Sequence, residues 1–204
     1  MAVHLIQPIE ESEMVAAFLA AETKSVRHRA RLVELLAFAG EDESLVERSD
    51  PGDARQNDAR ARLLGDFRGY RQDRELFKGF PLDGVRWYRA MVDSNSLSQV
   101  RYVDYSYWNQ LSSGTRRPAD AARRIRDGFR AFGLANDGFF AAADAVLRGI
   151  PLDPPILVGR DAGDALVVLE GHLRLTAYAL VPTHVPDPLP AIVGLSPRLS
   201  TWMK

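Results

Sequence analysis

Glu170, Gly171, His172 and Arg174 are the residues of this 204-residue chain whose types and spacing could do chemistry. A glycine lets the backbone approach a ligand closely, and the free N–H groups at the start of a helix favour an anion. Arg174 would add a guanidinium that holds a phosphate through two hydrogen bonds. Glu170 and His172 could move a proton beside it. The set therefore predicts a phosphate site, with Glu170 and His172 as candidate catalytic residues.

These residues lie where one predicted element ends and the next begins. The apolar run at residues 166–169 predicts a strand, and the apolar residues within 173–180 recur at helical spacing. Glu170 and Gly171 fall between the two as a tight turn. A strand, a turn and a helix in this order direct the amides of the helix start toward a ligand.

A second interpretation of the same residues stays open. Glu170 and Arg174 are four positions apart, so they could form an ion pair on the surface of the helix start, with Gly171 only a turn residue. Exposed ion pairs are common and contribute little to stability. The spacing alone does not separate this interpretation from a phosphate site.

The order of elements around the motif resembles the end of a ParB/sulfiredoxin-type domain. It runs through a strand at 155–158, an acidic turn at 160–164, a second strand, the Gly171-His172-Leu173-Arg174 box and a last strand at 190–193. In that superfamily, a Gly-x-x-Arg box at the start of a helix holds the phosphates of a nucleotide. The resemblance therefore implies that Gly171, His172, Leu173 and Arg174 bind ATP, ADP or CTP with Mg²⁺.

The polar loop at residues 109–118 extends this resemblance. In ParB-like domains an arginine in the loop before the long helix joins the phosphate site, and Arg116 and Arg117 are similar in position. The usual Asn-Pro-x-x-Arg spacing is not present here. The resemblance adds Arg116 and Arg117 to the expected nucleotide-binding residues.

The same resemblance limits which activities of the superfamily we expect of this chain. Sulfiredoxin chemistry requires a cysteine in the box, and this chain has no cysteine. Little sequence follows the last predicted strand, so we expect no helix-turn-helix domain of the chromosome-partitioning type. The chain resembles stand-alone members, which implies phosphoryl transfer to a small molecule or nucleotide hydrolysis. A non-catalytic binder of a phosphorylated metabolite and a nucleic-acid-binding or nuclease-like protein remain as alternatives.

Composition and charge bear on the partner. The net charge is −1, and residues 101–130 carry seven arginines against three aspartates, whereas residues 1–50 carry ten acidic against five basic groups. A nucleic-acid binder usually shows basic character across the whole domain, so this local excess favours a small anionic ligand. We see no membrane span and no signal peptide, and a cytoplasmic protein is expected.

The pattern of elements predicts an α+β fold in two parts. Residues 1–80 form a helical N-terminal extension, with helices at 10–22, at 26–37 after a cap by Ser25, and at 54–68 after a cap by Asp53, and with a polar linker or mobile loop at 41–58. Residues 81–204 form the ParB/sulfiredoxin-like domain, a small mixed sheet with flanking helices. The extension could cover the pocket or form a homodimer.

Residues 100–108 are unusually rich in aromatic side chains. Aromatic residues at this density most often belong to a core or an interface, because each of them buries a large apolar area. A wall on which a base or sugar ring stacks is the alternative. The segment itself does not decide between them.

Overall fold

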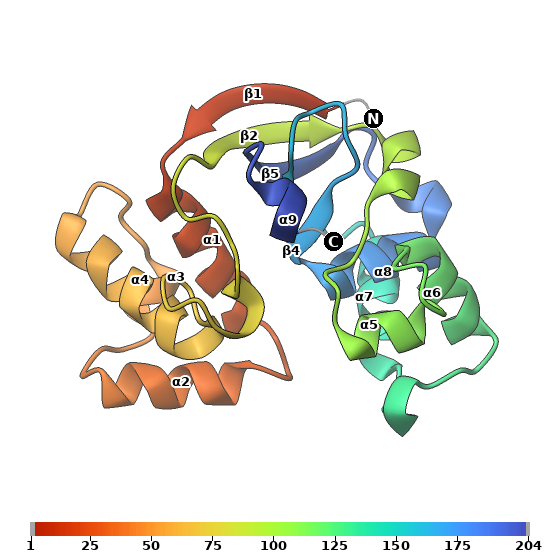
Figure 1. The fold of residues 1–204 in the computed structure, drawn as a ribbon. Coiled ribbons are helices and arrows are strands. Elements are labelled where there is room, and N and C mark those ends of the chain that lie inside the picture. Colours follow the sequence, from red (N-terminus) through yellow and green to blue (C-terminus); the bar gives the residue numbers. More distant parts are fainter. Residues whose placement is uncertain (1–2, 203–204) are drawn as a thin grey trace. The chain divides into compact units, whose positions relative to one another are not determined.

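The structure is a computed structural model that describes residues 3–202, with a five-stranded sheet and flanking helices (Figure 1). The predicted α+β class is confirmed at this level. The chain divides into two compact units, one of residues 9–87 and one of the described parts of 1–8 and 88–204. The described residues before Ile9 therefore group with the C-terminal part of the chain, whereas the sequence analysis placed them with the N-terminal helices.

The unit of residues 9–87 is helical. Its helices pack against one another, and apolar side chains among them, such as Phe18, Leu19 and Leu64, are buried. Asp53 caps the longest helix by accepting a hydrogen bond from the N–H of Gln56 at 3.1 Å, as predicted. Its elements are α1 (Glu11–Thr23), α2 (Arg29–Phe38), α3 (Ser44–Glu47), α4 (Ala54–Arg68) and a 3₁₀ turn (Glu75–Phe77).

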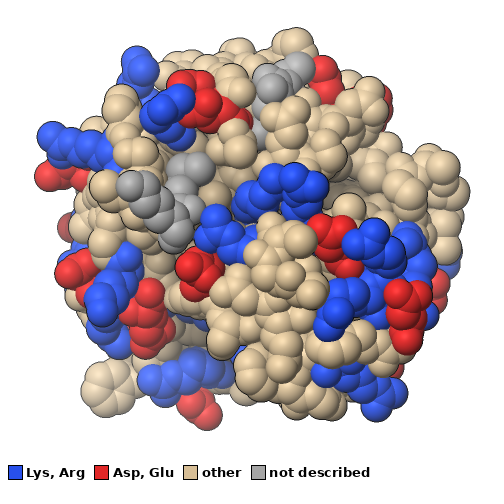
Figure 2. Space-filling view, turned by 45° about the vertical axis from the view of Figure 1, so that its right-hand side comes forward, with Lys and Arg blue, Asp and Glu red and all other residues tan. Residues whose placement is uncertain are grey.

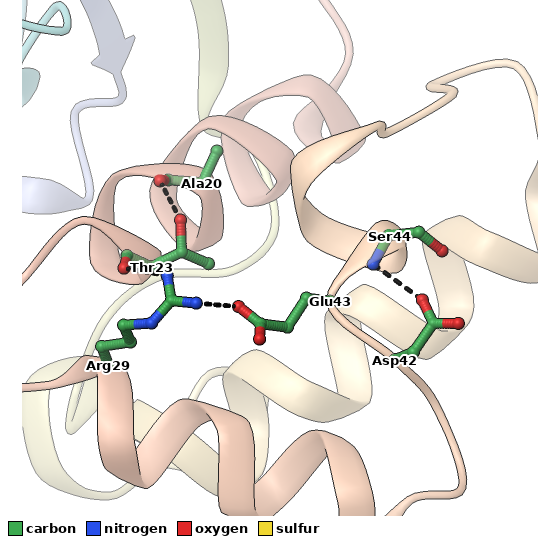
Figure 3. Close-up of polar contacts among 6 residues, drawn as sticks. All are labelled: Ala20, Thr23, Arg29, Asp42, Glu43 and Ser44. Carbon is green, nitrogen blue, oxygen red and sulfur yellow. Dashed lines mark hydrogen bonds and ion pairs between the residues drawn. The ribbon is translucent and has the colours of Figure 1, made fainter.

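Two predictions about this unit are wrong. Helix α2 begins at Arg29 rather than after Ser25, because the carbonyl of Ser25 accepts the N–H groups of His28 and Arg29 in a turn. The polar segment before the predicted helix at 54–68 is not a plain loop, since it contains α3. Helix α3 begins at Ser44, whose N–H donates a hydrogen bond to the Asp42 carboxylate at 2.7 Å (Figure 3 draws this contact).

Arg29 connects three segments of the helical unit by hydrogen bonds. Its guanidinium donates to the carbonyl of Thr23 at 3.1 Å and to the carboxylate of Glu43 at 2.5 Å (Figure 3). Thr23 in turn donates its hydroxyl to the carbonyl of Ala20 at 2.8 Å. These bonds link the end of α1, the start of α2 and the residue before α3.

The sheet has the strand order β1-β2-β5-β3-β4. Strands β3 and β4 are antiparallel neighbours on either side of the acidic turn at 160–164, and β3 is parallel to β5, with Ile156 opposite Ile192. Beyond β4, Arg101 forms a single parallel bridge to Val167. The strands are β1 (Val3–Ile9), β2 (Arg86–Val92), β3 (Ile156–Gly159), β4 (Val167–Glu170) and β5 (Leu189–Leu195).

Helices α6 and α7 both pack against α8, which follows β4 directly. Buried apolar residues from these helices and from the sheet form one core, which includes Tyr102, Leu157 and Val193. Helix α8 is therefore fixed on several sides, so the residues at its start have defined positions. The helices of this unit are α5 (Ser106–Leu111), α6 (Pro118–Arg126), α7 (Asp137–Leu147), α8 (His172–Leu180) and α9 (Leu199–Trp202).

Candidate functional site

The turn between β4 and α8 requires a glycine. Gly171 has φ of +100°, in the left-handed region that side chains disfavour. A β-carbon at this position would lie 2.9 Å from the Cβ atom of Pro155 and 2.9 Å from a terminal nitrogen of Arg174. Any other residue at this position would therefore force Pro155 or the Arg174 side chain to shift. The predicted strand, turn and helix are confirmed here.

Arg174 lies in the first turn of α8 and forms an ion pair with Glu170, between its Nη2 and the carboxylate Oε2. The two side chains are only 11% and 13% exposed, so the ion pair that the second interpretation expected does form, but it is largely shielded from solvent. A second carboxylate, that of Asp153, lies 3.9 Å from Nη1 of Arg174. The guanidinium therefore faces two carboxylates at the start of the helix.

Burial raises the pKa of the Glu170 carboxyl above its ordinary value. The nearby Asp153 raises this pKa further, while Arg174 and the N–H of Gly171 oppose the shift. A buried carboxyl with a raised pKa can hold a proton more readily than an exposed one, which is the property that general acid–base chemistry uses. Glu170 thus has the environment expected of a proton-transfer group.

The two sides of α8 face different surroundings, because residues four apart lie on the same side of a helix and residues two apart do not. Arg174 shares its side with Tyr178, on whose pKa it acts. His172 shares the other side with Thr176, whose hydroxyl lies 2.6 Å from the hydroxyl of Tyr102. The four residues of the box therefore do not point to one place.

His172 belongs to an aromatic cluster. Its ring is stacked on that of Trp108 at a centroid distance of 4.8 Å, and the Tyr102 ring is 5.8 Å away. Tyr102 is fully buried and belongs to the core. Leu173 has a side chain that is 41% exposed, so its contribution to an anion site would come from its backbone N–H. The stack fixes the orientation of the His172 ring.

Arg116 and Arg117 lie near Arg101. The carbonyl of Arg116 accepts the N–H of Tyr102 at 2.7 Å, and both arginines act on the pKa of Arg101. Sequence reasoning did not single out Arg101. A charged residue within the aromatic run at 100–108 was the signal that could have found it.

The donor set for a metal ion is incomplete within residues 3–202, where no three side chains of the His, Cys, Asp or Glu type converge. Glu170 and Asp153 are both turned toward Arg174, and this arrangement does not form a cation cage made by the protein alone. Mg²⁺ fits here only with most of its ligands from phosphate oxygens and water, which is how it commonly binds with nucleotides.

Comparison with family models, with curated proteins and with solved structures gave no match to this chain. No helix within residues 3–202 is both long and apolar enough to cross a membrane.

Proposed function

We propose that this chain is a ParB/sulfiredoxin-like protein that binds the phosphates of a nucleotide at the start of α8. The nucleotide would serve phosphoryl transfer to a small molecule or be hydrolysed next to it. The resemblance around residues 150–196 supports the proposal, together with a β4–Gly171–α8 connection of the kind that it implies. Gly171 and the amides of His172, Leu173 and Arg174 would face the phosphates, because the helix start carries partial positive charge.

The observation that carries the proposal is the buried guanidinium of Arg174 at this helix start. The carboxylate of Glu170 accepts a hydrogen bond from it and is also stabilised by the N–H of Gly171. This carboxylate thus has the same partners that a phosphate oxygen would use. A position that stabilises one oxyanion is suited to another, and a phosphate would compete with Glu170 for Arg174.

Phosphoryl transfer depends mainly on positioning and on neutralisation of charge. Arg174 and the α8 amides would hold the phosphate, and Glu170, once displaced from Arg174, would accept the proton of the attacking hydroxyl. Its raised pKa suits this role. The ring of His172 lies on the other side of α8, stacked on Trp108, so only the backbone N–H of His172 would contact the phosphates. The nucleotide itself, as its Mg²⁺ complex, would supply the transferable phosphoryl group.

Non-catalytic binding of a phosphorylated metabolite is the second candidate. The ion pair between Glu170 and Arg174 favours it, because a carboxylate that stays paired does not act as a base. A nucleic-acid partner has less support. On the face shown in Figure 2, basic and acidic side chains are interspersed, whereas a nucleic-acid surface usually carries one broad basic area.

The test uses two variants that are expected to act in opposite directions. Glu170→Gln releases Arg174 and should tighten binding of ATP, ADP or CTP in a calorimetric titration. The double variant Glu170→Gln/Arg174→Gln removes both charges together and should weaken binding by about 10- to 100-fold, the range for a lost hydrogen bond to a charged group. Equal affinities in the wild type and both variants would reject the proposal. If the wild type turns over the nucleotide and Glu170→Gln does not, the protein is an enzyme and not only a binder.

A further inference from the structure

Strand β1 (Val3–Ile9) forms one edge of the sheet and has a neighbouring strand on one side only. The strand order is β1-β2-β5-β3-β4, and no strand within residues 3–202 lies beyond β1 (Figure 1). The residues from His4 to Pro8 are all exposed. An edge strand presents unpaired N–H and C=O groups to any other strand that reaches it. The outer edge of β1 is therefore open to one more strand.

The start of β1 has a defined position in its unit, but its apolar side chains remain open to solvent. Val3 packs against the main core, and Nε2 of His4 lies 3.3 Å from the carboxylate of Asp93, which directly follows β2. Leu5 and Ile6 point to opposite faces of the sheet, because side chains alternate along a strand. Their exposed fractions are 40% and 63%. Strand β1 thus has an apolar side chain left to bury on each face.

The edge lacks the charged side chains that usually protect edge strands from pairing. Residues 3–9 contain no lysine, arginine, aspartate or glutamate, and His4 is their only titratable residue. Two copies of this strand can therefore lie side by side without bringing like charges together. A charged strand from another protein would find no ion-pair partner along the same edge. The composition favours an identical strand as the occupant.

We propose that β1 pairs with β1 of a second copy of this chain, antiparallel about a two-fold axis, to form a homodimer. Pro8 determines the register of this pair. A proline is accepted in a sheet where its nitrogen faces away from the neighbouring strand. Because the direction of the backbone groups alternates along a strand, the N–H and C=O groups of His4 and Ile6 face the same outer edge as Pro8.

One register satisfies these outward groups without using Pro8. It places His4 opposite the partner's Ile6, and Ile6 opposite the partner's His4, so that each pair exchanges two hydrogen bonds. A register that places Pro8 opposite His4 or Ile6 loses a hydrogen bond, because proline has no N–H to donate.

This register places the two copies of Leu5 opposite each other at the two-fold axis. The backbone groups of Leu5 face β2, so the two leucines form a non-hydrogen-bonded pair, with α-carbons about 4.5 Å apart. Their side chains then cover each other on the face where Val3 joins the core. Two short strands bury less area than a permanent dimer usually does, so this dimer dissociates on dilution.

The dimer does not depend on the proposed function at α8. Strand β4, which leads into α8, is at the opposite end of the strand order from β1. Variants of β1 therefore leave the residues at the start of α8 unchanged.

The first test uses the absence of cysteine from the chain, since any disulfide must then join introduced residues. Leu5→Cys places two thiols within the range of about 4.4–6.8 Å between α-carbons that a disulfide bridges. With oxidised glutathione as the oxidant, this variant should give a covalent dimer on a non-reducing gel. Gln7→Cys is the matched control, because Gln7 is also exposed and shares a face with Leu5, but lies opposite the partner's Val3.

Gln7→Cys should remain mostly monomeric under the same conditions. Equal cross-linking of Leu5→Cys and Gln7→Cys would indicate random collision and overturn the proposed pairing. Faster cross-linking of Ile6→Cys than of Leu5→Cys would overturn the register, and the proposed dimer with it.

The second test is sedimentation velocity of the full chain at increasing concentration. The wild type should change from monomer to dimer, and Leu5→Lys should raise the dissociation constant about tenfold or more, because two lysines then meet at the axis. Leu5 is exposed, so this variant should remain folded. Val26→Lys changes a fully exposed valine in the helical unit and should behave like the wild type.

Two results of this second test would overturn the proposal. A wild type that stays monomeric at every concentration would leave the edge of β1 to a strand of another protein. A dimer that Leu5→Lys does not weaken would have its interface elsewhere on the chain.

Discussion

Two groups of arginines lie near α8, and the chain surrounds them differently. Arg174 is buried and faces the carboxylates of Glu170 and Asp153. Arg101, by contrast, lies near Arg116 and Arg117, whose charges lower its pKa, while Asp120 opposes this shift. The contrast teaches that the chain places one cation against carboxylates and another near further cations.

The free-energy cost of removing a charge should therefore differ between Arg174 and the three arginines at positions 101, 116 and 117. Splitting a buried ion pair leaves an isolated charge in a poorly solvated place, which costs about 3–5 kcal/mol. Interactions between charges that water reaches contribute only about 0.2–1 kcal/mol. The variants below therefore separate the two groups by the size and by the sign of their effects on stability.

The largest effect is expected for Arg174→Ala, which strands the Glu170 carboxylate. The variant should lose about 3 kcal/mol of unfolding free energy in urea denaturation, because the buried charge has lost its partner. The double variant Glu170→Gln/Arg174→Gln removes both charges and should lose much less unfolding free energy. If the single and the double variant were equally destabilised, the pair would not be balancing a buried charge.

The next largest loss of unfolding free energy is expected for Gly171→Ala. It combines a left-handed backbone with a clash against Pro155, and we expect a loss of about 2 kcal/mol. Gly149→Ala is a matched control, since Gly149 has φ of +72° but an added β-carbon there meets no atom within 4 Å. Thermal unfolding should show the larger loss for Gly171→Ala. Equal losses would mean that close packing around Gly171 contributes nothing.

The pH dependence of stability should report on Glu170. Because burial raises its pKa in the folded state, the folded chain binds this proton more tightly than the unfolded chain does. Its contribution to stability is then fully present below the ordinary pKa of 4.5 and decreases as the pH rises through the raised value. Melting temperatures of the wild type and of Glu170→Gln, compared from low to neutral pH, should show this decrease only in the wild type. If the two melting temperatures changed with pH in the same way, Glu170 would not have a raised pKa in the folded chain.

The smallest effect, and one of opposite sign, is expected for Arg116→Gly in buffer without phosphate. Loss of the left-handed strain should raise the unfolding free energy by no more than about 1 kcal/mol, because the greater freedom of glycine in the unfolded chain offsets part of the gain. Chemical denaturation measures this difference. A clear destabilisation would show that the Arg116 side chain holds the loop in place.

Much of the fold could be predicted from local patterns. The strand before Glu170 and the helix after Gly171 follow from apolar spacing and from a glycine at the turn, and the Asp53 cap follows from the preference of helix starts for acidic side chains. The start of α2 was missed. The carbonyl of Ser25 accepts hydrogen bonds in a turn of its own, and local sequence does not distinguish a cap from such a turn.

The candidate site was harder to predict, because its geometry depends on contacts far apart in sequence. Spacing suggested a pair between Glu170 and Arg174, but its burial results from the surrounding packing. Likewise, Arg101 meets Arg116 and Arg117 only through backbone bonds to β4 and to the loop before α6. The stack of His172 on Trp108 also joins two distant segments.

The amide resonances of Gly171, His172, Leu173 and Arg174 provide the most direct measurement of the central claim. In a ¹⁵N-labelled sample titrated with ADP and Mg²⁺, these four amides should show the largest saturable shifts in the spectrum, because they would donate to the phosphates. Saturable shifts that appear elsewhere while these four amides stay unchanged would contradict a nucleotide site at the start of α8.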